Sequence, residues 1–302
     1  MACLSAPEAD LTAMSTFASV IIDGVEHDPA TASIPVSDIG FIRGYGCFEV
    51  IRAFDGTCFR LDEHLDRLGR SAAMLGIELP ARSDMSRWAG SVCEPGGQTL
   101  VRFLVSAGDD PFDGTARVVV TGEPAPPQAT ELRLLDVAAP WHSDGAEWEL
   151  VRGKTLSYAN NFAATRVARL AGYDDALLLG RSGRVLEGPT FSIGWVIPDG
   201  EDVIYETPAM SLGILDSITR QAALDAADEA GLAFREVEDD LSRLDAATEV
   251  FALSTLKDAV PVSAVGERTF RAGPATTALA TALGRLIERE VTGREGPLPG
   301  DE

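Results

Sequence analysis

Short apolar runs divide the first part of the chain into strands around one helix. The run 17–22 is apolar and β-branched, and the Asp23-Gly24 pair after it is typical of a hairpin turn. From Leu61 to Leu75 the apolar residues recur at helical spacing, with acids early and arginines late, which predicts a helix. Further strands are predicted at 48–54, 58–61, 100–106 and 116–121. The chain therefore opens with a small sheet and a helix.

A proline cluster at 122–127 separates this region from a second set of elements. We expect a small domain over 1–124, a linker over 125–130 and a larger domain over 131–302. In the larger domain the pattern predicts strands at 132–137, 176–179, 193–197 and 202–205, and helices at 218–230 and 276–289. Because strands and helices do not alternate regularly, the predicted class is α+β rather than doubly wound α/β.

Composition and charge exclude several classes of protein. The 302 residues are 45% apolar, and their formal net charge of −22 argues against binding of nucleic acid or anionic lipid. The cysteines and histidines show no zinc-ligand spacing, so we expect no metal site. No run approaches the roughly 18 apolar residues of a membrane helix, and no basic leader opens the chain. We therefore expect a cytoplasmic protein with a small-molecule ligand.

Lysine is rare in this chain. All but two of the 25 basic residues are arginine, and the exceptions are Lys154 and Lys257. A desolvated lysine can lose its proton and attack a carbonyl, whereas arginine keeps its charge. Lys154 stands at a predicted loop-to-helix transition four residues before Tyr158, which would place both side chains on one helical face. A lone lysine is usually a solvated surface residue, but the motifs around this one favour a Schiff-base lysine.

Two of these motifs lie beyond Lys154. Glu187 follows a strand and a turn, where a buried carboxylate would need a cationic partner such as a protonated pyridine nitrogen. Taken alone, it would be interpreted as a solvated turn residue. The segment 213–220 precedes a predicted helix, so the backbone N–H groups of Ile218 and Thr219 could hold a phosphate. The alternative is an ordinary helix start capped by a nearby polar side chain.

A third motif, 249–255, ends a predicted strand in Ser254 and Thr255. Their hydroxyl groups offer a second phosphate contact. Arg67, on the early predicted helix, could supply the positive charge. Each motif is weak alone, and their combination and order make them specific.

Together these residues resemble the class IV, fold-type IV pyridoxal-phosphate enzymes, the family of branched-chain and D-amino-acid aminotransferases and aminodeoxychorismate lyase. The resemblance covers nearly the whole chain and includes the early blocks 37–49 and 61–68. It implies a small α/β N-terminal domain, a larger pseudo-barrel C-terminal domain and pyridoxal 5'-phosphate as cofactor. It also implies a homodimer with the active site at the subunit interface.

The family's functional residues carry over onto named positions. The resemblance implies Lys154 as the Schiff-base lysine and general base, Glu187 as the partner of the pyridinium nitrogen, and Tyr158 as a hydrogen-bond donor to the ring oxygen. It implies no such role for Lys257. Packing under the ring and phosphate binding would fall to Leu215, Arg67, Thr255 and the amides of Ile218 and Thr219. The chain departs from the family at three positions, Ile39, Ser192 and Ser254, where arginine, asparagine and glycine are frequent.

The substrate prediction depends on Arg43, which could clamp a carboxylate with two hydrogen bonds or could be a surface arginine. Its Arg-Gly-Tyr-Gly element resembles the less typical D-amino-acid aminotransferases. We therefore expect transamination from D-amino acids, and from (R)-primary amines, to a 2-keto acid such as 2-oxoglutarate, with Phe41, Arg43 and Ser254 at the substrate. The alternatives are a branched-chain L-aminotransferase, an aminodeoxychorismate lyase and a pyridoxal-phosphate-binding protein without turnover.

Overall fold

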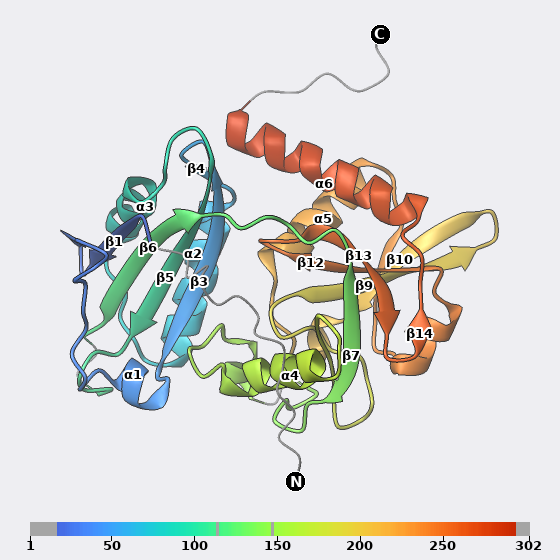
Figure 1. Ribbon diagram of the computed structural model, residues 1–302, viewed down its shortest axis with the longest axis horizontal. Coiled ribbons are helices and arrows are strands. Elements are labelled where there is room, and N and C mark those ends of the chain that lie inside the picture. Colours follow the sequence, from blue (N-terminus) through green and yellow to red (C-terminus); the bar gives the residue numbers. More distant parts are fainter. Residues whose placement is uncertain (1–16, 113–114, 146–147, 294–302) are drawn as a thin grey trace.

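A computed structural model describes residues 17–112, 115–145 and 148–293, which form two sheets with helices around them (Figure 1). The first sheet is antiparallel throughout and has the strand order β2-β1-β6-β5-β3-β4. Its strands are β1 (Ser19–Ile22), β2 (Val25–His27), β3 (Gly46–Phe54), β4 (Thr57–Cys58), β5 (Gln98–Ser106) and β6 (Arg117–Pro124). Three helices accompany it: α1 (Ile39–Arg43), α2 (Leu61–Met74) and α3 (Arg82–Ser91).

The alternation of side chains along β3 explains how the first sheet and its helices are organised. Ile51 points from one face of the strand into a core that includes Leu65 and Leu68 of α2. Successive side chains of a strand point to opposite faces, so Phe48 and Val50 face the other way, toward a cavity that they line with Lys154. One strand thus contributes to the core and to the wall of this cavity.

The second sheet is mixed, with the strand order β11-β10-β9-β12-β13-β7-β8 and a short strand, β14, paired to β13. The pairs β10–β11, β13–β7 and β7–β8 are parallel and the others are antiparallel. The strands are β7 (Leu132–Ala138), β8 (Asp175–Leu179), β9 (Ser192–Asp199), β10 (Asp202–Pro208), β11 (Phe234–Val237), β12 (Glu249–Ser254), β13 (Asp258–Val265) and β14 (Arg268–Thr269). This mixture of strands and helices confirms the α+β class.

Helices cover the second sheet through small and aliphatic side chains. The helices are α4 (Ala159–Leu170), α5 (Ile218–Glu229) and α6 (Pro274–Thr292), with 3-10 turns η1 (Glu149–Arg152), η2 (Met210–Leu212) and η3 (Leu241–Ala246). Ala222 and Ala226 of α5 share a core with Leu279 and Leu283 of α6. Their small size lets α5 lie close to the sheet, and its N-terminus faces β3 and β5 of the first sheet across a cavity. Within the described ranges, no helix is both long and apolar enough to cross a bilayer.

The elements that the pattern did not predict include β13 and α3, and each of these two has a physical reason. The strand β13 lies inside the sheet between β12 and β7, although Pro261 pairs with Phe251 within it. A proline argues against an interior strand because it has no N–H to donate. The helix α3 buries only Met85, Trp88 and Ala89, so its apolar stripe is too short to give a periodic signal.

Candidate active site

A cavity of about 280 Å³ lies between the two sheets. Its walls come from β3 and β5 of the first sheet and from the segments around Lys154, Glu187, α5 and the β12–β13 turn. Every predicted site residue except Phe41 and Arg43 lines it: Arg67, Lys154, Tyr158, Glu187, Leu215, Ile218, Thr219, Ser254 and Thr255. A second cavity of about 480 Å³ shares Lys154, Tyr158, Glu187 and Leu215 with the first. Lys154 therefore borders both spaces.

The backbone around Lys154 is extended, and this corrects one prediction. Helix α4 begins only at Ala159, so Lys154 and Tyr158 do not share a helical face. Instead, Thr155 forms an antiparallel bridge with Cys47 of β3, and the N–H of Phe48 donates to the carbonyl of Lys154 over 2.9 Å. Pairing with the first sheet satisfies backbone groups that a helix would have used.

The side chain of Lys154 is desolvated and lies over an aromatic ring. Its Nζ atom is 4.4 Å from the centroid of Phe48. Burial, and then the nearby charge of Arg67, lower the pKa of Lys154 to about 8. A neutral amine is therefore accessible near physiological pH, and this is the form that attacks a carbonyl carbon.

Glu187 is a buried carboxylate at a tight bend. Both of its oxygens lie 3.3 Å from the backbone N–H of Leu215, which donates to them. Burial raises the pKa of Glu187 to about 7. A Cβ on the next residue, Gly188, would lie 2.1 Å from the ring of Phe191, so the bend requires glycine. A cation placed beside Glu187 would gain a strong partner.

The end of the cavity at α5 carries N–H donors. Ser217 is the N-cap of α5, and its side chain accepts from the N–H of Arg220. The amides of Ile218 and Thr219 belong to the first turn of α5, where N–H groups have no partner within the helix and the helix dipole is positive. Arg67 enters the same end from α2, and its Nη1 donates to the carbonyl of Asp216 over 2.7 Å.

Two predicted hydroxyl ligands already donate to backbone carbonyls. The hydroxyl of Tyr158 donates to the carbonyl of Pro189 over 2.6 Å, and that of Thr255 donates to the carbonyl of Val50 over 3.3 Å. Each hydroxyl has one proton and keeps lone pairs that can accept. In this arrangement Tyr158 can accept a hydrogen bond from a ligand, and it could donate one only by leaving Pro189.

The polar groups that line this cavity match the chemical groups of pyridoxal phosphate. The helix N-terminus with Arg67 offers N–H donors to a phosphate, and Glu187 offers a carboxylate to a protonated ring nitrogen. Lys154 lies in the wall of the same cavity, with an amine for the aldehyde. Leu215 would supply an apolar surface for the ring. These residues would hold the cofactor without any change in the fold.

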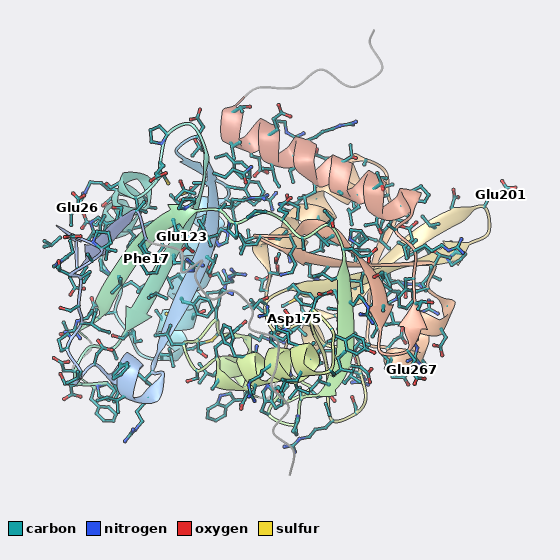
Figure 2. The ribbon with its side chains drawn as sticks, viewed as in Figure 1. Phe17, Glu26, Glu123, Asp175, Glu201 and Glu267 are labelled. Carbon is teal, nitrogen blue, oxygen red and sulfur yellow. The ribbon has the colours of Figure 1, made fainter. Side chains whose placement is uncertain are left out.

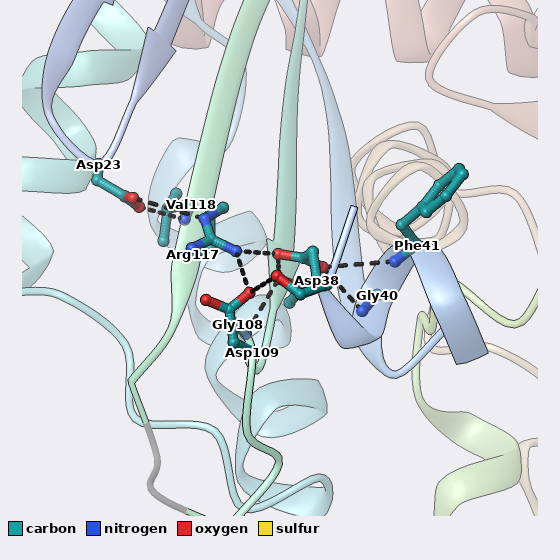
Figure 3. A network of polar contacts seen from close by, with 10 residues as sticks. Asp23, Asp38, Gly40, Phe41, Gly108, Asp109, Arg117 and Val118 are labelled. Carbon is teal, nitrogen blue, oxygen red and sulfur yellow. Dashed lines mark hydrogen bonds and ion pairs between the residues drawn. The ribbon is translucent and has the colours of Figure 1, made fainter. Parts of the chain in front are cut away.

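Phe41 and Arg43 are exposed on α1 and lie outside both cavities. The side chain of Phe41 is 73% exposed, and Figure 3 shows its ring pointing away from the polar network that holds α1. The centre of that network is Asp38, which is buried and accepts from the N–H of Gly40 over 2.8 Å and from the hydroxyl of Ser106 over 2.8 Å. The chain thus fixes α1 firmly while presenting both side chains outward.

Phe48, Val50 and Arg102, which the sequence did not single out, also line the first cavity, and so does Lys257, to which the sequence gave no role. Arg102 lies opposite Val50 in the β3–β5 register and forms an ion pair with Glu123 on β6, which is labelled in Figure 2. A lone arginine inside the apolar run 100–105 was a usable signal for it. The rarity of lysine drew attention to Lys257, but its place in the cavity follows only from the β12–β13 turn, which brings its Nζ to 5.4 Å from the ring of Phe191.

Comparison with known proteins adds sequence and fold relationships. The family profile described as Amino-transferase class IV matches residues 46–265. A putative branched-chain-amino-acid aminotransferase of Methanocaldococcus jannaschii is 30% identical over 258 residues, which cover 82% of this chain and 88% of that protein. A D-alanine aminotransferase of Bacillus licheniformis is 29% identical over 284 residues, which cover 90% of this chain and 98% of that protein.

A solved structure shows the same fold. It is described as a hypothetical aminotransferase from Mycobacterium tuberculosis in its PLP-bound form, and the TM-score is 0.82 at 23% identity. The match covers 92% of this chain and 100% of that one.

Proposed function

The chain belongs to the class IV aminotransferases, pyridoxal-phosphate-dependent enzymes of fold type IV, and we propose that it moves the amino group of a D-amino acid, or of an (R)-primary amine, to a 2-keto acid such as 2-oxoglutarate. One observation supports the chemistry above all others. A desolvated lysine, a buried carboxylate and a helix N-terminus surround one cavity of about 280 Å³. Each matches one functional group of the cofactor.

Each residue has a distinct task in this proposal. The bound cofactor supplies an electron sink for the bond that breaks at the substrate's α-carbon. Lys154 is neutral once it is released from the cofactor. It would take the α-proton as general base and then, as general acid, return this proton to the cofactor carbon. Glu187 holds the proton on the ring nitrogen. Arg67 and the amides of Ile218 and Thr219 anchor the phosphate, so that the reacting carbon stays within reach of Lys154.

The choice of D-amino acids rests on Arg43 and on the relative from Bacillus licheniformis named D-alanine aminotransferase. Arg102 is a second cation for a substrate carboxylate, and it lines the cavity directly. A branched-chain L-amino acid is the second candidate, because Phe48, Val50 and Phe162 give the same cavity an apolar wall. The relative from Methanocaldococcus jannaschii carries a branched-chain name.

Arg43 lies outside the cavities of its own chain and can reach a substrate only if it belongs to a second subunit. We therefore also propose a homodimer. We propose the cytoplasm as its location. Apolar side chains on α1 and α4 are exposed in the single chain and would be covered in a dimer: Phe41, Ile42, Phe162, Val167 and Leu170. Mixing the inactive variants Lys154→Ala and Arg43→Ala should restore part of the activity, because one site of a mixed dimer keeps both residues. A mixture that stays inactive would contradict the shared site.

The decisive experiment is a half-reaction on the purified holoenzyme. Titration with D-alanine should convert the absorbance of the lysine-bound cofactor to that of its amine form, whereas L-leucine should leave it unchanged. The reverse result would favour the branched-chain candidate. Lys154→Ala should abolish the reaction. Lys257→Ala is the matched control, since it removes the other lysine of the same cavity, and it should retain turnover.

A further inference from the structure

Arg67 is held from behind by a buried carboxylate on β3. Its Nε donates to Oε1 of Glu49 and its Nη2 donates to Oε2, each over 2.7 Å. Glu49 is fully buried, and Oε2 also lies 2.8 Å from Nδ1 of His64, which is buried on α2. The guanidinium and the carboxylate thus form a paired, planar contact, with the imidazole as a third member.

The count of N–H groups defines what Arg67 can still bind. A guanidinium has five N–H groups, one on Nε and two on each terminal nitrogen. Glu49 takes the one on Nε and one on Nη2, and the carbonyl of Asp216 takes one on Nη1. One N–H is left on each terminal nitrogen, and Arg67 lines the cavity beside Ile218 and Thr219. Two N–H groups in one rigid plane match two oxygens of a phosphate.

Glu49 stands next to Phe48 in β3, and Phe48 contacts Lys154, so the Glu49–Arg67 pair is directly connected to the lysine. Phe48, the preceding residue, points to the other face of β3 and lies under Nζ of Lys154. Glu49 points toward α2. Burial alone would raise the pKa of Glu49, but the charge and hydrogen bonds of Arg67, with a hydrogen bond from His64, hold it well below its usual range. The carboxylate is therefore ionised at neutral pH, and it stays paired with Arg67.

We propose that Glu49 is a positioning residue for the cofactor phosphate: it fixes the Arg67 guanidinium by Nε and Nη2, so that the one N–H left on each terminal nitrogen binds the phosphate. His64 assists by holding Oε2 of Glu49. Because Glu49 also neutralises Arg67, the arginine contributes directed hydrogen bonds rather than net charge, and the positive end of α5 supplies the electrostatic attraction. The inference depends on the proposed placement of the phosphate.

The test compares two ligands that differ only in the phosphate. The full-length protein, freed of cofactor, is titrated with pyridoxal 5'-phosphate and with pyridoxal, and the two Kd values are measured by absorbance. Glu49→Gln should raise the Kd of pyridoxal phosphate about 10- to 100-fold, the size expected for loss of hydrogen bonds to a charged group. The Kd of pyridoxal should change less than about 3-fold. Arg67→Met should give the same pattern.

Glu206→Gln is the matched control, because Glu206 is also a fully buried, ionised carboxylate paired with arginine. It accepts from Nε of Arg243 over 2.9 Å and from Nε1 of Trp195 over 2.7 Å, on β10 and away from the cavity. This variant should lower the unfolding midpoint and leave the ratio of the two Kd values unchanged. A change of that ratio in Glu206→Gln would overturn the proposal, because the ratio would then report general loosening.

Two further outcomes would also overturn it: equal weakening of both ligands in Glu49→Gln, or no weakening of either. If Glu49→Gln does not fold, His64→Asn is tested instead. It should raise the ratio of the Kd of pyridoxal phosphate to that of pyridoxal by a smaller factor, about 3- to 10-fold. An unchanged ratio there would count against the proposal. Because the readout is binding, it is independent of transamination. A protein that shows this ratio but no half-reaction would contradict the proposed function and leave the role of Glu49 intact.

Discussion

At the scale of single residues, burial makes the pKa values of two ionisable groups in the site more similar to each other. Burial lowers the pKa of Lys154 to about 8 and raises that of Glu187 to about 7, because each charge is costly away from water. In the cofactor-free protein both groups therefore change charge near neutral pH. A cofactor that brings a cationic ring and an aldehyde gives each group the partner that it lacks.

The lowered pKa of Lys154 predicts how cofactor attachment depends on pH. Only the neutral amine attacks an aldehyde, so the attachment rate should rise with pH and level off above about 8. For a solvated lysine the rise would continue toward about 10.4. Stopped-flow absorbance after mixing cofactor-free protein with pyridoxal phosphate measures this rate. Lys257→Ala should give the same profile, and a midpoint near 10 would show that Lys154 is solvated.

Some residues of the site could be predicted from the sequence and others could not. Lys154 and Glu187 stand in motifs, and lysine is so rare in this chain that Lys154 was one of two candidates. Arg102 belongs to an apolar strand whose facing direction follows only from the register with β3. Glu49 was visible within a matching block, but nothing in the local sequence pairs it with Arg67. That contact requires β3 and α2 to be packed together.

At the scale of secondary-structure elements, the last helix begins on a buried carboxylate from another element. Glu249, at the start of β12, accepts from the N–H of Ala275 over 3.1 Å and from that of Thr276 over 2.7 Å. These donors belong to the first turn of α6, where no carbonyl of the helix can reach them. A Cβ on Gly273 would lie 2.1 Å from Oε1 of Glu249, so the N-cap position is glycine to admit the carboxylate.

Removal of this cap should destabilise the protein. Glu249→Ala leaves two buried N–H groups without an acceptor, and we expect the free energy of unfolding to fall by about 2 to 3 kcal/mol. Glu249→Gln should cost less, because its amide oxygen can still accept. Urea unfolding followed by tryptophan fluorescence measures both variants. Glu288→Ala, on the exposed face of α6, is the control and should be nearly neutral; equal losses for Glu288→Ala and Glu249→Ala would refute the capping role.

The periodicity of apolar residues predicted the elements that have a long apolar stripe. It missed the elements whose conformation depends on contacts with other parts of the chain. The helix predicted at 276–289 is α6, which buries Leu279, Leu283, Leu286 and Ile287 at helical spacing. The start of α4 was placed too early, because Lys154 pairs with β3 instead of continuing a helix. The strand β13 contains Pro261, so local rules argued against it. In both cases a tertiary partner decided the local structure.

At the scale of the whole molecule, the cavity has walls from both sheets, and specific contacts join these sheets. Asp258, the first residue of β13 after the β12–β13 turn, forms an ion pair with Arg52 of β3. Its other oxygen accepts from Nε2 of Gln128 over 2.7 Å, and Gln128 belongs to the segment between β6 and β7. One carboxylate thus joins the two sheets and the segment that connects them. The same turn carries Thr255 and Lys257 into the cavity.

This contact predicts that stability and cofactor affinity change together. Asp258→Asn keeps the left-handed backbone conformation at φ 48°, which asparagine tolerates, but leaves the buried Arg52 without an anionic partner. We expect a loss of about 2 kcal/mol in the free energy of unfolding, less than for a fully buried pair, because the Asp258 side chain is 26% exposed. The Kd of pyridoxal phosphate should rise as well, because the turn that holds Thr255 is released.

Asp55→Asn is the matched control for this prediction. Asp55 has φ 49° in the β3–β4 turn, and its Oδ1 accepts from the N–H of Gly96, a hydrogen bond that asparagine can replace. This variant carries the same substitution at the same backbone conformation, within one domain, and should change neither stability nor affinity. Urea unfolding and cofactor titration measure both variants side by side. If Asp258→Asn behaves like Asp55→Asn, the ion pair does not hold the domains together, and the alignment of the two walls of the cavity must depend on the other contacts between them, such as that of Arg67 with the carbonyl of Asp216.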